Sequence, residues 1–204
     1  MKALSSFVVL VMCLLTPRTQ AQTRMSAPVT WKQTWDVGVW TGEAIGVSLG
    51  SSDSNASLTM AGFDVSRVIR RSWAEGNNRP TLEYVFEATP LFLVTKPQTV
   101  YGGGFSPLGI RWSFADKGRY QPYLQWNGGG MFTRSDVPPG RTASFNFTTS
   151  IGPGVMFRMH HNQALSVGVR LWHLSNAGKG HTNPSFNTVQ VVIGYHWLKN
   201  GLLR

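Results

Sequence analysis

The chain has 204 residues, a length typical of one domain, and a formal net charge of +10. Its only cysteine, Cys13, lies near the N-terminus, so the remaining sequence can form no disulfide, thiol nucleophile or thiolate metal site. The positive charge favours anionic partners such as lipid phosphates, whereas the lack of a Lys/Arg run or a basic helix argues against nucleic acid.

Residues 1–21 predict a cleavable signal peptide. Lys2 gives a positive start, Leu4–Leu15 is a mostly apolar run, and Ala21 is a small residue before a cleavage site at Gln22. The apolar run is too short to cross a bilayer as a helix. Cleavage removes the positive charges of Lys2 and Arg18, which lowers the formal charge from +10 to +8. Residues 22–204 are then expected to form one exported domain.

After residue 22 the sequence predicts β-strands and no helix. Stretches rich in β-branched and aromatic residues are separated by Gly, Asn, Asp, Ser and Pro. The predicted strands are 34–48, 58–70, 81–94, 105–115, 120–131, 143–159, 163–175 and 186–198. Several strands alternate; in the seventh, the apolar face is Val167, Val169 and Leu171, and the intervening residues are polar or small. In the third, Glu83 and Glu87 share the polar face.

Alternation of this kind suits a soluble sandwich or a membrane barrel. Three features favour the barrel: the strands have 11 residues or more, their number is even, and aromatic residues lie toward strand ends, as in interfacial girdles. The expected girdle residues are Trp31, Trp35, Trp126, Trp172, Tyr195 and Trp197. We therefore expect an all-β fold, an eight-stranded antiparallel transmembrane β-barrel of an outer membrane. Its inward-facing acids, Glu83 and Glu87, are expected to pair with lumen arginines such as Arg70 or Arg111.

The connections between the predicted strands differ in length. Those at 116–119 and 160–162 are expected to be tight, and those at 49–57, 95–104, 132–142 and 176–185 to be longer. The connection at 71–80 is long where a short one is expected. Because short periplasmic turns alternate with longer outer loops in such barrels, the seventh strand should end at the outer surface.

Polar residues interrupt the apolar face of the seventh and eighth strands at this outer end. His173 and Ser175 continue the face of Val167, Val169 and Leu171, and Asn187 lies on the matching face of the next strand. Polar side chains on a lipid-facing surface are costly unless they lie at the interface or serve a function. The pattern indicates a possible site on the outside wall of the barrel.

The segment 173–187, HLSNAGKGHTNPSFN, resembles the PagL-type lipid A 3-O-deacylases, also called acyloxyacyl hydrolases. It fits the family's H-x-S-N-A-G motif and the following N-P-x-x-N/E without a gap. The resemblance implies a serine esterase in the outer membrane of a Gram-negative bacterium, which hydrolyses the ester-linked acyl chain at the 3-position of lipid A. Lipid A and outer-membrane lipids are the implied partners, a homodimer is left open, and no metal or cofactor is implied.

The resemblance also implies a role for each polar residue of the segment. Ser175 would be the nucleophile and His173 the general base that a serine hydroxyl needs. The side-chain amide of Asn176 and the backbone N–H of Gly178 would form the oxyanion hole. Asn183 would brace the loop.

The third catalytic position departs from the family, because Asn187 stands where the best-known members have glutamate. An amide oxygen can orient the imidazole but cannot stabilise the imidazolium by charge, and the equivalent acid-to-amide change in a serine protease costs roughly 10⁴-fold. No Asp or Glu follows Asp136. The enzyme could use Ser-His-Asn, be slow, or have lost catalysis. The alternative function is a non-catalytic barrel acting as an anchor or adhesion surface, which would not need a nucleophile at Ser175.

Overall fold

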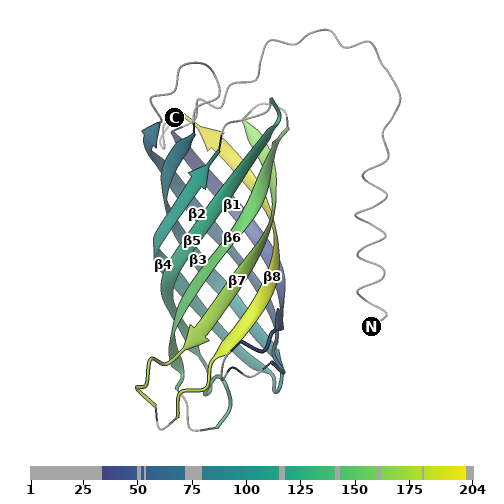
Figure 1. Ribbon diagram of the computed structural model, residues 1–204, viewed down its shortest axis with the longest axis vertical. Coiled ribbons are helices and arrows are strands. Elements are labelled where there is room, and N and C mark those ends of the chain that lie inside the picture. Colours follow the sequence, from purple (N-terminus) through teal and green to yellow (C-terminus); the bar gives the residue numbers. More distant parts are fainter. Residues whose placement is uncertain are drawn as a thin grey trace, which may run out of the picture.

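The computed structural model describes residues 34–49, 52, 54–71, 80–114, 118–140, 143–159, 162–180 and 182–200. The expected signal peptide and Trp31 lie outside these residues. Within them, antiparallel strands form a closed barrel in chain order, with β8 pairing to β1 (Figure 1). The strands are β1 (Trp35–Gly46), β2 (Ser57–Arg71), β3 (Thr81–Lys96), β4 (Val100–Ser113), β5 (Tyr120–Thr133), β6 (Phe145–Arg158), β7 (Gln163–Ser175) and β8 (Phe186–Lys199). The described residues contain no helix long and apolar enough to cross a membrane.

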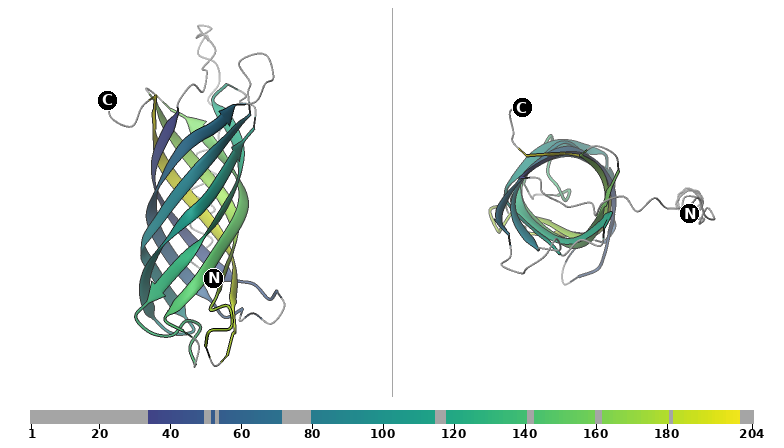
Figure 2. Two further views of the ribbon diagram at one scale, coloured as in Figure 1. Left: turned by 90° about the vertical axis from the view of Figure 1, so that its left-hand side faces the viewer. Right: turned by 90° about the horizontal axis from the view of Figure 1, so that it is seen from above.

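The barrel confirms the expected fold class, and each predicted strand matches an observed one to within a few residues. The strands have 12 to 16 residues, more than the roughly 9–11 that a tilted membrane-spanning strand needs. The view along the axis shows the closed ring (Figure 2). Closure leaves no strand edge with unpaired backbone groups, which a bilayer would not tolerate.

The outward surface is apolar and the inward surface is largely polar. In β7, Val167, Val169 and Leu171 are 44%, 45% and 51% exposed, whereas Ser166 and Arg170 are buried in the lumen. A soluble protein has the reverse arrangement, with a polar outside and an apolar inside. An apolar outer surface is expected where the barrel is surrounded by lipid. The predicted outward face of β7, and with it the outward direction of His173 and Ser175, is confirmed.

Two of the expected girdle positions are wrong. Trp172 points into the lumen and is 8% exposed, because it has the opposite parity to the lipid-facing residues of β7. Trp126 does face outward, but it lies near the middle of β5. Tyr195 and Trp197 fit the expectation better, since their rings pack edge to face at 4.8 Å near the end of β8.

Ion pairs fill the half of the lumen toward the start of β1 and the end of β8. The Arg111 guanidinium lies among three carboxylates, with nitrogen–oxygen distances of 2.7 Å to Asp36, 3.1 Å to Asp64 and 3.5 Å to Glu83. Glu87 pairs instead with Arg170 at 2.9 Å. The sequence therefore predicted the partner of Glu83 correctly, and the partner of Glu87 is an arginine that it did not single out. These charged side chains occupy the lumen, and their pairing offsets the cost of burying them.

An apolar cluster closes the other half of the lumen, beneath the outer connections. Leu58, Phe92, Leu174 and Phe186 are each fully buried there. Leu174 lies between His173 and Ser175 in sequence and points inward, so its packing anchors the end of β7. Complete burial of a leucine side chain contributes about 1.5–3 kcal/mol.

The predicted long connection at 95–104 is wrong. β3 continues to Lys96 and β4 begins at Val100, which leaves only residues 97–99 between them. The glycines at 102–104 suggested a loop, but they pair with β5. A Cβ on Gly102 would lie 2.4 Å from the Phe132 carbonyl oxygen, and one on Gly104 would lie 2.2 Å from that of Gly130. Glycine is used here for close strand approach, as its lack of a side chain permits.

Candidate active site

The outer end of β7 places two polar side chains on the lipid-facing wall. His173 and Ser175 are two residues apart and both half-buried, with the fully buried Leu174 between them. In the register, His173 lies opposite Asn187 of β8, and Ser175 lies opposite Phe147 of β6. The pairing of β7 with β8 thus brings His173, Ser175 and Asn187 of the predicted site together, and β6 adds Phe147 beside them.

Hydrogen bonds connect Asn187, His173 and Ser175 in a chain. The Nδ1 atom of His173 lies 2.7 Å from Oδ1 of Asn187, and its Nε2 atom lies 3.0 Å from Oγ of Ser175. An amide oxygen can only accept, so Nδ1 carries the proton and Nε2 is the acceptor for the serine hydroxyl. That tautomer is the one that a general base acting on Ser175 requires.

The orientation of the Asn187 amide is fixed from its other side. Its Nδ2 donates to the Leu49 carbonyl oxygen at 3.0 Å, and a carbonyl can only accept. The backbone carbonyl of Asn187 accepts a hydrogen bond from the Val47 N–H at 2.8 Å. The Ser52 hydroxyl holds this segment by donating to the Val47 carbonyl and accepting from the Leu49 N–H, each at 3.1 Å. The β1–β2 connection therefore holds Asn187 in the orientation that His173 needs.

These contacts give a structural reason for asparagine at position 187. The side chain must accept from His173 and donate to Leu49 at the same time, and an amide has one group of each kind. A carboxylate has no N–H, so it would set an oxygen against the Leu49 carbonyl oxygen. The sequence could not reveal this partner, because Leu49 is 138 positions earlier in the chain.

A tight turn follows Ser175. Ala177 and Gly178 have φ angles of 53° and 77°, and the Lys179 N–H donates to the Asn176 carbonyl at 3.1 Å. Positive φ at two successive positions is favourable for glycine and strained for alanine. The turn therefore fixes the path of the backbone directly after Ser175.

The two expected oxyanion donors make hydrogen bonds inside this loop. Asn176 is 1% exposed; its Oδ1 accepts from the Gly178 N–H at 2.9 Å, and its Nδ2 donates to the Thr182 carbonyl at 2.8 Å. Asn183, expected to be the brace, is exposed and makes no side-chain hydrogen bond within the described part of the chain. The structure thus places Asn176 as the internal brace of the loop and leaves the Asn183 amide accessible.

Aromatic rings cover the wall beside the site. Phe132, Phe145 and Phe147 form a row across β5 and β6, with centroid distances of 4.7 Å and 5.2 Å between successive rings. Phe132 and Phe147 are exposed on the outward surface. An apolar aromatic surface next to a serine hydroxyl suits an ester attached to a lipid chain.

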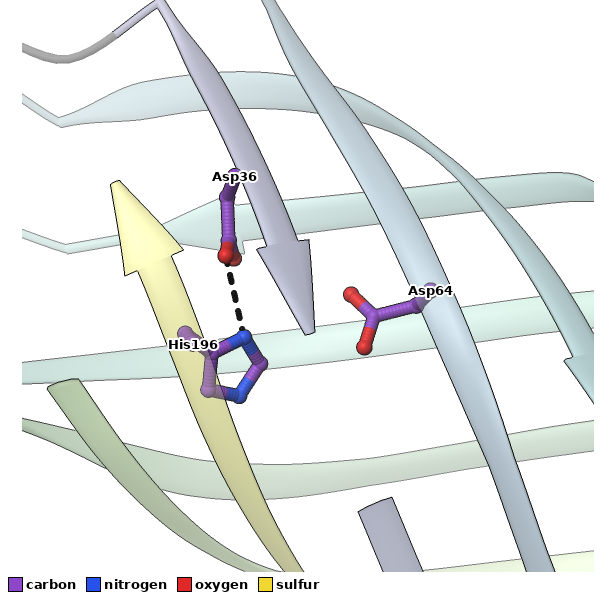
Figure 3. Close-up of side chains that lie close together, drawn as sticks. All are labelled: Asp36, Asp64 and His196. Carbon is purple, nitrogen blue, oxygen red and sulfur yellow. Dashed lines mark hydrogen bonds and ion pairs between the residues drawn. The ribbon is translucent and has the colours of Figure 1, made fainter. Parts of the chain in front are cut away.

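The described residues hold one group of possible metal ligands, and it lies away from this site. Asp36, Asp64 and His196 approach one another in the lumen (Figure 3). His196 bridges Asp36, at 3.0 Å, and the Ser166 hydroxyl, at 2.8 Å. Arg111 already contacts both carboxylates, so the group is a buried ion-pair network. Nothing in it reaches the outer wall.

Fold and site together define a class of protein, an outer-membrane barrel with a hydrogen-bonded serine–histidine pair on its lipid-facing wall. The sequence matches the lipid A 3-O-deacylase (PagL) family over residues 18–196. The chain belongs to this family and is a lipid A 3-O-deacylase, an ester hydrolase of the outer membrane. Membership of this family favours the hydrolase over the non-catalytic anchor considered from the sequence.

Comparison with the solved structure of PagL supports the fold. The crystal structure of the outer membrane enzyme PagL has a TM-score of 0.51 and 18% sequence identity, over 78% of this chain and 97% of that one. Neisserial surface protein A (NspA) has a TM-score of 0.49 and 16% identity, over 80% of this chain and 96% of that one. At such identities the likeness to PagL shows the barrel alone. No curated protein sequence matches the chain.

Proposed function

We propose that Ser175 cleaves the 3-position ester of lipid A with His173 as its base and Asn187 as the residue that orients His173. The observation that carries the proposal is the hydrogen-bonded chain on the outward wall, 2.7 Å from Asn187 to His173 and 3.0 Å from His173 to Ser175. The second distance lies in the range that proton transfer from a nucleophile to its base requires, and the first is that of a hydrogen bond that orients the imidazole.

The proposed reaction proceeds through an acyl-enzyme. Ser175 Oγ attacks the ester carbonyl carbon and its proton passes to His173 Nε2. The tetrahedral intermediate then collapses, the bond to the sugar oxygen breaks, and His173 returns the proton to that oxygen. Water, deprotonated by His173, then attacks the acyl carbon, the bond from that carbon to Ser175 Oγ breaks, and His173 returns the proton to Ser175 Oγ as the fatty acid leaves. Asn187 holds the imidazole in position through both transfers without adding negative charge.

The oxyanion hole in this proposal uses Gly178 and Asn183, with Asn176 as a positioning residue. An oxyanion is a stronger acceptor than the neutral Asn176 oxygen that now holds the Gly178 N–H at 2.9 Å, so it can compete for that donor. Asn176 also fixes the Thr182 carbonyl, directly before the exposed Asn183. This arrangement changes the roles inferred from the sequence for Asn176 and Asn183 and keeps that of Gly178.

The location of the site explains how the enzyme reaches its substrate. His173 and Ser175 lie at the end of β7 on the lipid-facing wall. In the proposed orientation this is the level of the ester bonds of outer-leaflet lipids, so a lipid can reach Ser175 without leaving the membrane. The proposal includes export to a Gram-negative outer membrane by residues 1–21, with cleavage after Ala21. Its other parts are contacts with outer-membrane lipids and catalysis by side chains alone, and a homodimer stays an open alternative.

Mass spectrometry of lipid A tests the function directly. Cells of a Gram-negative host that express the chain should contain lipid A that lacks one ester-linked hydroxyacyl chain, lost from the 3-position. Cells expressing the Ser175→Ala variant at the same level in the outer membrane are the matched control. Unchanged lipid A in both cultures, with folded protein present, would contradict the proposal.

Substitution of the two loop asparagines tests the revised oxyanion hole. Removal of one oxyanion donor lowers kcat by about 10²–10³-fold in well-studied hydrolases, so Asn183→Ala should do the same without loosening the loop. Asn176→Ala should also lower kcat, but with faster proteolysis at residues 176–185, because the Gly178 and Thr182 contacts are lost. Limited proteolysis alongside kinetics separates the two. A loss of kcat for Asn176→Ala with an intact loop, and none for Asn183→Ala, would restore the original assignment.

A further inference from the structure

A lysine ammonium lies beside the proposed nucleophile. The turn after Ser175 fixes the backbone of Lys179 through its hydrogen bond to the Asn176 carbonyl at 3.1 Å. The Nζ atom of Lys179 lies 4.9 Å from the centroid of the Phe147 ring. Phe147 is the register partner of Ser175 on the neighbouring strand. The positive charge therefore stands over the outward wall next to the reacting hydroxyl.

This charge has no acidic partner in the part of the chain that the structure describes. The ion pairs of Arg111, Arg170 and His196 lie in the lumen, away from Lys179. The sequence holds no Asp or Glu after Asp136. Lys179 is exposed, and its ammonium lies against the face of Phe147. An exposed, unpaired ammonium at the level of lipid headgroups attracts phosphate.

We propose that Lys179 binds the phosphate on the glucosamine that carries the scissile ester. The inference rests on the proposed role of Ser175. In lipid A this sugar bears a phosphate at position 1 and the ester at position 3, so both groups belong to one rigid ring. A cation held beside the nucleophile can bind the first while Ser175 attacks the second. A lysine ammonium has three donors and suits a phosphate as a point charge.

The aromatic surface beside Lys179 agrees with this placement of the lipid. The aromatic row of Phe132, Phe145 and Phe147 runs along the wall beneath the ammonium, with Phe132 and Phe147 open to lipid. The phosphate would lie at Lys179, the ester carbonyl at Ser175 and the acyl chain against the rings. Lys179 thereby becomes a specificity residue that selects phosphorylated lipid A.

Kinetics on two substrates test the proposal. The first is diphosphorylated lipid A, and the second is the same lipid without the phosphate at position 1, each in mixed detergent micelles. Lys179→Ala should lower kcat/KM on the first by about tenfold, mainly through KM, as expected for loss of one charge-assisted contact. It should leave the second substrate unchanged. Lys179→Arg, which keeps the charge, should retain most of the preference.

Lys96 provides the matched control. It is an exposed lysine at the same rim, at the end of β3, and four strands from β7 on the opposite side of the barrel. Lys96→Ala should change neither substrate. An equal loss on both substrates for Lys179→Ala would show that the residue only shapes the turn, and no loss on either would also overturn the proposal.

Lipid retention keeps this test separate from the test of catalysis. Native mass spectrometry of the Ser175→Ala protein should show more bound diphosphorylated lipid than lipid lacking the position-1 phosphate. Adding Lys179→Ala should remove that difference. Failure of the wild type to hydrolyse lipid A would count against the role of Ser175, whereas equal retention of both lipids by the Ser175→Ala protein would count against Lys179.

Discussion

Ser175→Ala and His173→Ala should each lower the rate of lipid A deacylation by up to about 10⁶-fold, the loss found when a serine hydrolase loses its nucleophile or base. The two effects should not add, because either substitution disables the same proton transfer across 3.0 Å. Release of 3-hydroxy fatty acid from purified lipid A, followed by mass spectrometry, gives the rates.

The folded state should survive both substitutions. His173 and Ser175 face outward and are half-buried, so neither change opens a cavity in the lumen. Leu174→Ala is the matched contrast, because Leu174 lies between them and is fully buried. It should cost about 2–5 kcal/mol of stability. Retention of the compact form on unheated detergent gels monitors folding. Wild-type activity in folded Ser175→Ala protein would place the nucleophile elsewhere.

Asn187 gives the second large effect. Asn187→Ala should lower kcat by about 10–100-fold, less than loss of Ser175 or His173, since the imidazole loses its orientation but no charge stabilisation. The backbone contact between the Asn187 carbonyl and the Val47 N–H remains, so the β1–β2 connection should stay in place. Single-turnover kinetics, which isolate the chemical step, are the appropriate measurement.

Asn187→Glu tests whether the site depends on the amide. The family's glutamate would raise the rate in a site of unchanged geometry, because a carboxylate stabilises the imidazolium. Here the amide N–H donates to the Leu49 carbonyl at 3.0 Å, and a carboxylate would leave that carbonyl facing another acceptor. Such an unsatisfied contact costs about 1–3 kcal/mol. We therefore expect kcat to fall by about tenfold.

The outcome for Asn187→Glu separates two accounts of this departure from the family. A lower rate would show that the site has been rebuilt around an amide held by Leu49. A rate above that of the wild type would show that the Leu49 contact is dispensable. It would also show that the wild-type site lacks only the negative charge that stabilises the His173 imidazolium. Asn187→Asp, which keeps the length of the side chain, controls for the extra methylene of glutamate.

The sequence alone determined which way the side chains face. Alternation along Val167, Val169 and Leu171 has a period of two, so parity placed His173 and Ser175 on the lipid side before any contact was known. The same local rule predicted the strands and the inward direction of Glu83 and Glu87. It failed at the glycines of 102–104, because composition cannot distinguish a loop from a strand that needs close approach to its neighbour.

Only the tertiary structure decided which groups meet. The pairing of His173 with Asn187 depends on the register between β7 and β8, and the contact of Asn187 with Leu49 depends on closure of β8 onto β1. The exchange of roles that we propose for Asn176 and Asn183 rests on the path of a loop that leaves one amide buried and the other exposed. The Asn187–Leu49 contact joins residues 138 positions apart, and local periodicity carries no information about register or loop path.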